Sequence, residues 1–204
     1  MLIYLDANIV QYCADYGDLI FSGEVQTGIS SVKLEAELRA LGQVIHLALR
    51  TEEQDLDHRW DVAAPKHLLD ELFRGKPTPE QRDTYELLRE AWCDLGVDSY
   101  SPPDIEAVIA ADMRLRSLEL CDEPDRRHLA EAIAMGATWF LTLDNDVLYK
   151  TRDRDKPSGP GRIEGVIVAR PSELRARMTF DPVFGLRVAE PSVPDLSRIG
   201  IITA

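Results

Sequence analysis

The sequence predicts an α/β fold with three layers, in which helices cover both faces of a central parallel sheet. Its strand candidates are short and apolar, as at residues 2–5 and 138–143, which is typical of strands buried on both faces. Longer segments with helical spacing separate these strands, and parallel strands require such crossover connections. With 204 residues, of which 45% are hydrophobic and 29% charged, the chain is long enough for one domain with a sizeable core.

Turn and cap residues divide the first half of the chain into elements. In order, we predict a strand at residues 2–5, a helix at 31–51, a strand at 60–64, and helices at 66–73 and 78–95. Pro65 precedes the helix at 66–73 and Gly75 follows it, and these are positions that proline and glycine favour at helix ends. Thr78, Pro79 and Gln81 supply a cap, a first-turn proline and a capping-box partner for the next helix.

The second half of the chain continues this alternation. We predict a helix that opens at 101–103, a helix from 124 to 136, strands at 138–143 and 165–168, and a helix at 172–178. The first of these helices is expected to bury one apolar side, formed by Ile105, Val108, Ile109, Met113 and Leu115. Residues 1–180 are predicted to form one domain, and residues 181–204, which carry three prolines, a C-terminal extension.

The net charge of the chain limits the kinds of molecule that it can bind through charge alone. Lys and Arg number 23 against 36 Asp and Glu, and the net charge of −13 argues against nonspecific, charge-driven binding to nucleic acid or anionic membranes. A local basic segment or a bound metal ion can still attract nucleic acid in spite of the negative net charge. Cys13, Cys93 and Cys121 have no paired spacing, and the N-terminus has no basic segment before Asp6. No apolar stretch approaches the ~20 residues of a membrane helix, so we expect a cytoplasmic protein without a membrane partner.

Four acids from distant segments fall at one edge of the predicted sheet. Asp6 ends the first strand, and Asp144 follows the strand at 138–143. Asp125 lies in the first turn of the helix that leads into that strand, and Glu71 lies early in the helix after the strand at 60–64. The carboxyl ends of parallel strands share one edge of the sheet, and ligands of open α/β sheets bind there.

Such a cluster of carboxylates needs a cation. Two carboxylates about 5 Å apart repel each other by roughly 3 kcal/mol at an effective dielectric constant near 20. Because the cluster offers oxygen ligands and no His or Cys, it favours Mg²⁺ or Mn²⁺ over zinc. Bound ions of this kind activate water and stabilise the oxygens of a phosphoryl displacement.

Each acid also has a structural interpretation. Asp6 can cap the segment that follows it, and Asp125 suits the first turn of any helix. Glu71 can be a solvated surface residue, and Asp144 can be a turn residue. It is their joint placement that favours a metal site. His128, three residues after Asp125, is expected to pack or to form a hydrogen bond on its helix rather than to bind metal.

Several segments resemble the PIN domain, a family of metal-dependent ribonucleases that includes many toxins of bacterial toxin–antitoxin pairs. They are Leu5-Asp6-Ala7-Asn8-Ile9-Val10, the segment at 65–72, and the block formed by 125–132 and 136–146. The block is the specific part, and the resemblance covers residues 2–178. It implies a parallel sheet with helices on both faces, Mg²⁺ or Mn²⁺ as the cofactor, and RNA as the substrate.

The resemblance also assigns roles to individual residues. It implies an acidic site made of Asp6, Glu71, Asp125 and Asp144, with Asp146 as an outer acid. Asn8 matches the polar residue that the family keeps beside its first Asp. Thr142 matches the hydroxyl residue that stands two residues before its last Asp.

Two features depart from compact PIN toxins. The stretch between Asp6 and Glu71 is longer, and it contains Glu37, which is an alternative for the second acid. We favour Glu71 because a strand and Pro65 precede it directly and place it near the edge. The chain is also larger than minimal toxins, which weakens the toxin assignment more than the nuclease assignment.

A basic segment between residues 150 and 162 follows Asp144 at the same edge. Together with the arginines beside Asp125, it is expected to hold the phosphate backbone of RNA. The residues assigned to substrate binding are Asn8, Thr142, Arg126, Arg127, Lys150, Arg152 and Arg154. The alternative is a solvated loop whose Arg and Asp side chains pair with one another.

The leading hypothesis is metal-dependent hydrolysis of RNA phosphodiester bonds by an endoribonuclease. A protein inhibitor (an antitoxin) and a second copy of the chain are candidate partners. One alternative is an Mg²⁺-dependent, phosphatase-like hydrolase in which Asp6 attacks phosphorus and forms a covalent intermediate. The other is a catalytically degenerate PIN-like module that binds protein or RNA without cleaving it.

Overall fold

The sheet defines the architecture of the computed structural model, which describes residues 1–24, 28–29, 31–53, 60–63, 78–79, 82–83, 86, 89, 103–117, 123–153 and 159–179. In this part of the chain, five strands form one sheet in the order β2-β1-β3-β5-β4. They are β1 (Leu2–Leu5), β2 (Asp61–Ala63), β3 (Trp139–Leu141), β4 (Gly161–Ile163) and β5 (Val166–Ala169). All neighbours pair in parallel except β4, which is antiparallel to β5.

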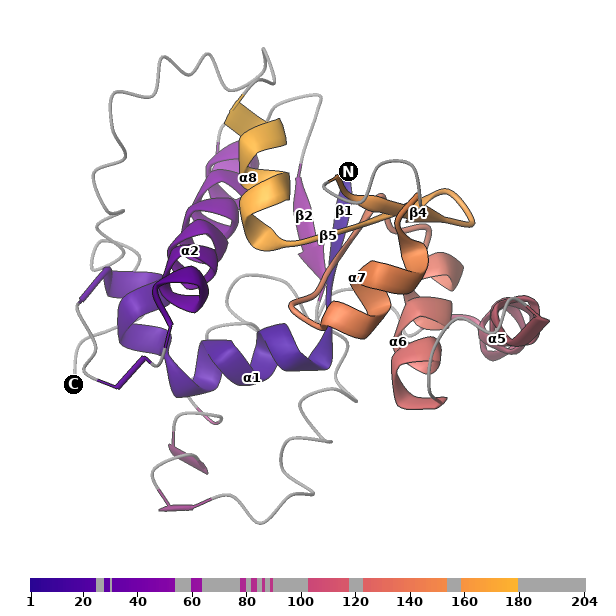
Figure 1. The fold of residues 1–204 in the computed structure, drawn as a ribbon, viewed down its shortest axis with the longest axis horizontal. Helices are drawn as coiled ribbons and strands as arrows, with labels where there is room; N and C mark the ends of the chain where they lie inside the picture. Colours follow the sequence, from indigo (N-terminus) through magenta and orange to yellow (C-terminus); the bar gives the residue numbers. More distant parts are fainter. Residues whose placement is uncertain are drawn as a thin grey trace.

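Helices cover both faces of this sheet. The described ones are α1 (Ala7–Asp15), the π-helix η1 (Asp18–Ser22), α2 (Val32–Glu53), α5 (Ile105–Ser117), α6 (Glu123–Ala134), α7 (Asn145–Thr151) and α8 (Pro171–Thr179). Figure 1 shows α2 and α8 side by side on one side of the strands and α6 on the other, with α5 packed outside α6. The prediction of a three-layer α/β/α fold with a mostly parallel sheet is therefore confirmed.

The central strands are buried on both faces, as their apolar sequences predicted. In β1, Ile3, Tyr4 and Leu5 are at most 1% exposed. Tyr4 is opposite Phe140 of β3 in the sheet, and their rings stack with centroids 5.6 Å apart. Cys13 lies in the same core, and burial raises the pKa of its thiol to about 12.

The hairpin formed by β4 and β5 was not predicted, because Gly161 and Arg162 were assigned to the basic segment. Its two-residue turn, Glu164 and Gly165, has φ angles of 49° and 88°. Positive φ at both central residues is the conformation of the tight turns that match the twist of paired strands. Glycine readily supplies such an angle, but Glu-Gly is a weaker turn signal than Asn-Gly or Asp-Gly.

The buried side predicted for the helix at 105–117 is partly wrong. Ile105, Ile109 and Met113 are 72%, 55% and 66% exposed, whereas Ala111 and Leu115 are fully buried. The helix carries two apolar stripes, and its packing against α6 covers the stripe that contains Ala111 and Leu115. Hydrophobic spacing alone does not distinguish a stripe that faces the core from one that faces outward.

An ion pair joins α5 to α6 at the end of their contact. The Asp112 carboxylate accepts a hydrogen bond from Arg126 Nε on α6 at 2.7 Å and another from Arg116 Nε on its own helix at 2.8 Å. Burial raises the pKa of the Asp112 carboxyl, but the hydrogen bonds and charges of the two arginines outweigh burial and hold that pKa below its ordinary value of 3.8. Asp112 is therefore ionised at neutral pH and links the two helices.

We expect the Asp112 carboxylate to contribute to the free energy of unfolding, and we expect this contribution to depend on pH. A carboxyl whose pKa is lowered on folding stabilises the folded state above its unfolded pKa, and this contribution disappears as the pH falls through the folded pKa. Asp112→Asn should therefore be less stable than the wild type at pH 7, and the difference should shrink as the pH falls below 3.8, the ordinary pKa of the group. Urea unfolding of both proteins at several pH values measures it. A difference that persists unchanged at acidic pH would contradict this account.

Some predicted features lie outside the described residues: the helix at 66–73 with Glu71, most of the helix at 78–95, Arg154, Cys93, Cys121 and the extension at 181–204. In the part of the chain that is described, none of the helices combines the length and the apolar character that crossing a membrane requires.

Candidate functional site

The sheet order creates a switch point at the carboxyl ends of β1 and β3. The chain leaves β1 through α1 and α2 to reach β2 on one side, and it leaves β3 through α7 to reach β4 and β5 on the other side. Two connections that leave a pair of neighbouring strands in opposite directions form a switch point, where open α/β sheets bind their ligands. The residues that follow β1 and β3 are therefore the first candidates for a site.

Asp6 lies at this switch point, directly after β1. Its backbone N–H donates to the carbonyl of Leu141 at the end of β3, 3.0 Å away, which ties the ends of the two strands together. Its side chain is the N-cap of α1 and accepts a hydrogen bond from the N–H of Ala7 at 2.8 Å. The residue is 2% exposed, so its carboxyl group requires further hydrogen bonds in place of water.

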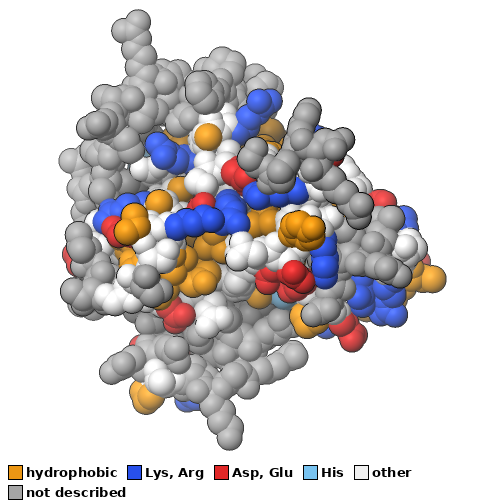
Figure 2. Space-filling view, viewed as in Figure 1, with side chains coloured by type: hydrophobic (Ala, Val, Ile, Leu, Met, Phe, Trp, Pro, Cys, Tyr) orange, Lys and Arg blue, Asp and Glu red, His pale blue; other side chains and the backbone are white. Residues whose placement is uncertain are grey.

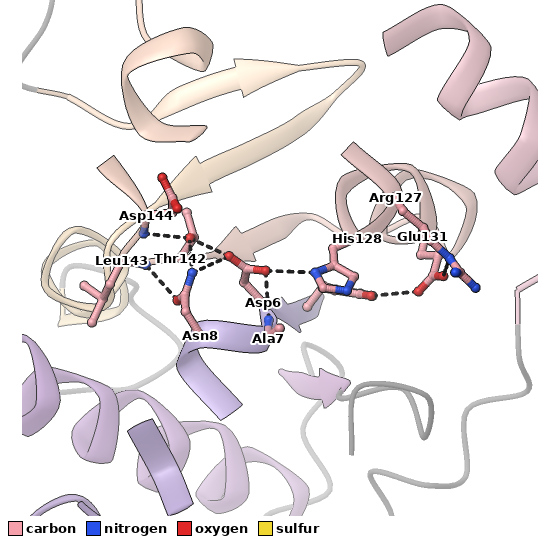
Figure 3. A network of polar contacts seen from close by, with 10 residues as sticks. Asp6, Ala7, Asn8, Arg127, His128, Glu131, Thr142, Leu143 and Asp144 are labelled. Atoms are coloured by element: carbon pink, nitrogen blue, oxygen red, sulfur yellow. Dashed lines mark hydrogen bonds and ion pairs between the residues drawn. The ribbon is translucent and has the colours of Figure 1, made fainter. Parts of the chain in front are cut away.

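Three side chains supply those hydrogen bonds (Figure 3). Asn8 Nδ2 and Thr142 Oγ1 each donate to Asp6 Oδ2 at 2.6 Å. His128 Nδ1 lies 3.2 Å from Asp6 Oδ1, the oxygen that also accepts from Ala7. Each carboxylate oxygen therefore has two partners, and the orientation of the Asp6 side chain is defined from three different elements.

Asn8 also holds the loop that follows β3. Its Nδ2 lies 2.9 Å from Thr142 Oγ1, and its Oδ1 accepts a hydrogen bond from the N–H of Leu143 at 3.1 Å. The N–H of Asp144 then donates to Thr142 Oγ1 at 3.0 Å. The hydroxyl of Thr142 thus connects Asp6 to Asp144, and the segment after β3 is positioned against the start of α1.

Asp144 begins α7. Its Oδ1 accepts from the N–H groups of Asp146 at 2.6 Å and Val147 at 3.3 Å, which is the geometry of an N-cap. Among the described residues, Asp144 Oδ2 has no hydrogen-bond partner. A cap that uses one oxygen leaves the other available for a ligand at the edge of the sheet.

Helix α6 brings a second row of polar groups to β1. It leads into β3, which is parallel to β1, so the helix runs antiparallel to β1. Tyr4 O–H donates to Glu131 Oε2 at 3.0 Å, and Asp6, two residues further along the strand, contacts His128, one turn earlier on the helix. The next turn toward the helix N-terminus carries Asp125, which is half-buried. This register places Asp125 beyond His128, toward the carboxyl edge.

The structure joins four of the predicted site residues directly: Asp6, Asn8, Thr142 and Asp144. Asp125 lies on the helix that contributes His128. Asp146 has a side chain that is 71% exposed and forms an ion pair with Lys150 at 3.1 Å. Glu71 lies outside the described residues.

Glu37, the alternative second acid, has partners of its own. Its Oε2 accepts from the N–H of Ser172 at 3.0 Å, and its Oε1 accepts from the Ser172 hydroxyl at 2.9 Å. It is 7% exposed. Glu37 therefore connects α2 to the first turn of α8, where its charge also suits the helix dipole.

The basic residues assigned to substrate binding form ion pairs with acids of the chain. Arg126 pairs with Asp112 at 2.7 Å, and Arg127 with Glu131 at 3.4 Å. Lys150 pairs with Asp146, and Arg152 pairs with Glu173 of α8 at 2.6 Å. Arg154 lies outside the described residues. The pairs of Arg126 and Arg152 are the most enclosed, with side chains 13% and 15% exposed.

Two residues at this edge were absent from the predicted site. His128 was expected to form a hydrogen bond, but its partner Asp6 is 122 residues away and was not foreseen. Arg170 follows β5 directly and donates from Nη2 to Asn145 Oδ1 at 2.7 Å. Arg170 could have been identified from its position at the end of a predicted strand, but only acidic residues were considered at such positions.

The side chains at this edge can be compared with those that a metal ion requires. Among the described residues, no three His, Cys, Asp or Glu side chains are grouped so that they could hold a metal. Mg²⁺ often binds through one or two carboxylates and keeps several waters, which substrate phosphates then replace. Asp6 and Asp144 are two carboxylates at this edge, and Thr142 links the Asp6 side chain to the backbone N–H of Asp144.

No protein-family model matches this chain, and neither the comparison with curated proteins nor the comparison with solved structures found a match. The fold and the hydrogen-bond network around Asp6 are therefore the basis for any functional assignment.

Proposed function

We propose that this protein is a metal-dependent endoribonuclease of the PIN type, with its site at the carboxyl ends of β1 and β3. The observation that carries the proposal is the hydrogen-bond network around Asp6 at the switch point. It unites Asn8, Thr142 and Asp144, which the resemblance to PIN domains singles out. On the same grounds we propose RNA as the substrate, the cytoplasm as the location, and an antitoxin-like inhibitor as a candidate partner.

The proposed cofactor is Mg²⁺ or Mn²⁺. Asp6 and Asp144 would hold it, with Asp125 and Glu71 as further ligands and Asp146 as an outer acid. Carboxylate oxygens are hard ligands of the kind that these ions prefer. A bound ion of this class supplies an activated water and stabilises charge on phosphate oxygens.

The residues around Asp6 would keep its carboxylate in one orientation. Asn8 and Thr142 donate to one oxygen, and Ala7 and His128 to the other. Partners that orient a metal-binding residue in this way change metal affinity or activity by about 10–100-fold when they are removed. Because an ionised carboxylate can only accept hydrogen bonds, His128 would donate from Nδ1.

The hydrogen bonds around Asp6 also argue against the phosphatase-like alternative, in which Asp6 attacks phosphorus. Four hydrogen bonds to the Asp6 carboxylate stabilise its negative charge. This stabilisation makes the carboxylate a weaker nucleophile toward phosphorus. The geometry therefore favours attack by water over a covalent intermediate on Asp6.

Cleavage of a mixed RNA pool in the presence of Mn²⁺ tests the proposal. The wild type should cleave RNA with Mn²⁺ and lose this activity in EDTA, and Asp125→Asn should be strongly impaired. Equal cleavage by wild type and Asp125→Asn would indicate a contaminant or another site. Trapping of a phosphate or fluoride adduct at Asp6 would instead support the phosphatase-like alternative. Unchanged melting with Mn²⁺ and no cleavage would support a binding module.

Substitutions of His128 separate positioning from packing. Asn carries a donor nitrogen on Cγ, where His carries Nδ1, whereas the donor of Gln lies one bond further out. His128→Asn should therefore retain RNA cleavage within a few-fold, and His128→Gln and His128→Ala should lose about 10–100-fold. Isothermal titration with Mn²⁺ should rank the variants in the same order. Equal effects of Asn and Gln would show that the Nδ1 contact has no special role.

A further inference from the structure

Arg170, at the end of β5, differs from the other basic residues at this edge of the sheet. Its Nη2 donates to Asn145 Oδ1 at 2.7 Å, and in the described part of the chain it forms no ion pair with an acid. The four described basic residues that were assigned to substrate binding all pair with acids. A guanidinium held by a neutral amide keeps its positive charge available for an anion.

The backbone of Arg170 is fixed on both sides. The last residue of β5 accepts a hydrogen bond through its carbonyl from the N–H of Thr142 at 3.1 Å, and the Thr142 hydroxyl contacts Asp6. On the other side, Pro171 begins α8, and Glu173 Oε2 accepts from the N–H of Arg170 at 2.8 Å, as in a capping box. The guanidinium therefore extends from a rigid anchor beside the proposed site.

An exposed aromatic ring lies on the same side of α7 as the partner of Arg170. Tyr149 follows Asn145 by four residues, so the Cβ atoms of the two residues are about 5–6 Å apart on one face of the helix. Side chains of a helix lean toward its N-terminus, and the N-terminus of α7 lies at the carboxyl edge of β3. Tyr149 is 82% exposed and is the only aromatic residue among the exposed large hydrophobic residues described.

The other charges around α7 are arranged in pairs. Asp146 pairs with Lys150 at 3.1 Å, and Arg152 pairs with Glu173 at 2.6 Å. Figure 2 shows Lys and Arg side chains beside hydrophobic ones over α7, which Figure 1 places near the middle of the same view. This surface therefore offers one cation without an acidic partner and one uncovered ring, with Asn145 between them.

We infer that Arg170 and Tyr149 form a subsite for one nucleotide of an RNA strand, in which the guanidinium binds the phosphate and the phenol ring stacks on the base. Asn145 uses one N–H of the guanidinium, and the planar fork of an arginine can bind phosphate oxygens through parallel N–H groups. Positive charge combined with an aromatic platform is how proteins bind single strands. The inference rests on the proposed function in taking RNA as the ligand.

Fluorescence anisotropy with a labelled, single-stranded oligouridine tests the phosphate contact on the full chain. EDTA is present, so that neither a metal ion nor cleavage contributes. Arg170→Ala should weaken binding about tenfold and reduce the salt dependence of log K by about 0.7, the value for one phosphate of a single strand. Arg170→Lys should retain the salt dependence, since it keeps the charge. Arg177→Ala removes the same charge from the exposed last turn of α8 and should bind as the wild type does.

Substitutions of Tyr149 measure the stacking contact separately. Tyr149→Phe keeps the ring and should bind the oligouridine within about twofold of the wild type, whereas Tyr149→Leu should bind about tenfold more weakly. Both variants should retain the salt dependence of the wild type, because neither changes a charge. Circular dichroism and thermal melting identify any variant that fails to fold.

The subsite is refuted if the wild type does not bind the oligouridine at low salt, or if folded Arg170→Ala retains the full salt dependence. Equal binding by Tyr149→Phe and Tyr149→Leu also refutes it. Cleavage with Mn²⁺ is measured separately, so the two proposals can fail independently. A wild type that cleaves RNA, with variants that all bind as it does, refutes the subsite alone. A wild type that binds through these residues and never cleaves supports the subsite and refutes the proposed activity.

Discussion

Asp6→Asn should lower Mn²⁺-dependent RNA cleavage by at least about 100-fold. A metal ion contributes several kcal/mol of charge stabilisation in phosphoryl displacement, and about 1.4 kcal/mol corresponds to tenfold in rate. The substitution removes the negative charge at the centre of the network. It also places an amide N–H₂ group where the carboxylate accepts four hydrogen bonds, so at least one donor loses its partner.

The matched control is Asp15→Asn, which makes the same change of charge on the exposed side of α1. It should leave the cleavage rate unchanged. Circular dichroism and thermal melting of Asp6→Asn establish whether the variant is folded, since Asn is also a good N-cap for α1. A folded Asp6→Asn variant with full activity would eliminate the proposed site.

Gly42→Ala should destabilise the chain by about 2–3 kcal/mol, because there is no room for a methyl group at this position. Gly42 lies in α2, and a Cβ built on it would overlap the backbone carbonyl of Ile20 in η1. A backbone atom cannot rotate away as a flexible side chain can, so α2 and η1 would have to separate. For a chain of this size, the melting temperature should fall by about 4–12 °C.

Gly17→Ala is the control for Gly42→Ala. A Cβ at position 17 would meet only the Phe21 ring at 3.7 Å, which is ordinary van der Waals contact, and its φ of −53° suits any residue. This variant should melt close to the wild type. If the two alanine variants had the same stability, the close approach of α2 and η1 would not be a stabilising feature of the fold.

Four of the five described strands, and the helices α2, α5, α6 and α8, were predictable because their signals are local. The apolar run at residues 2–5, the proline and glycine around the helix at 124–136, and the β-branched and aromatic strand near 140 each act within one element. The rule that parallel strands share a carboxyl edge then placed Asp6 and Asp144 together, and Thr142 joins them.

The partners of the buried polar groups were not predictable in this way. His128 contacts Asp6, Glu37 bonds to Ser172, and Arg152 bonds to Glu173. The residues that flank them in the sequence contain no signal that identifies these partners. Several Arg and Lys residues predicted to contact RNA also form ion pairs within the chain. Which side chains form such pairs depends on how the helices and strands pack against one another in the folded chain.

The sequence alone therefore determined the class of fold, four of the five described strands, and the edge of the sheet where Asp6 and Asp144 lie, because all three follow from local patterns and a general rule of chain connection. Only the tertiary structure decided which stripe of α5 is buried, where a glycine is indispensable, and which donors surround Asp6. These features depend on contacts between segments more than a hundred residues apart or on the packing of one helix against another. A local pattern of residues carries no information about them.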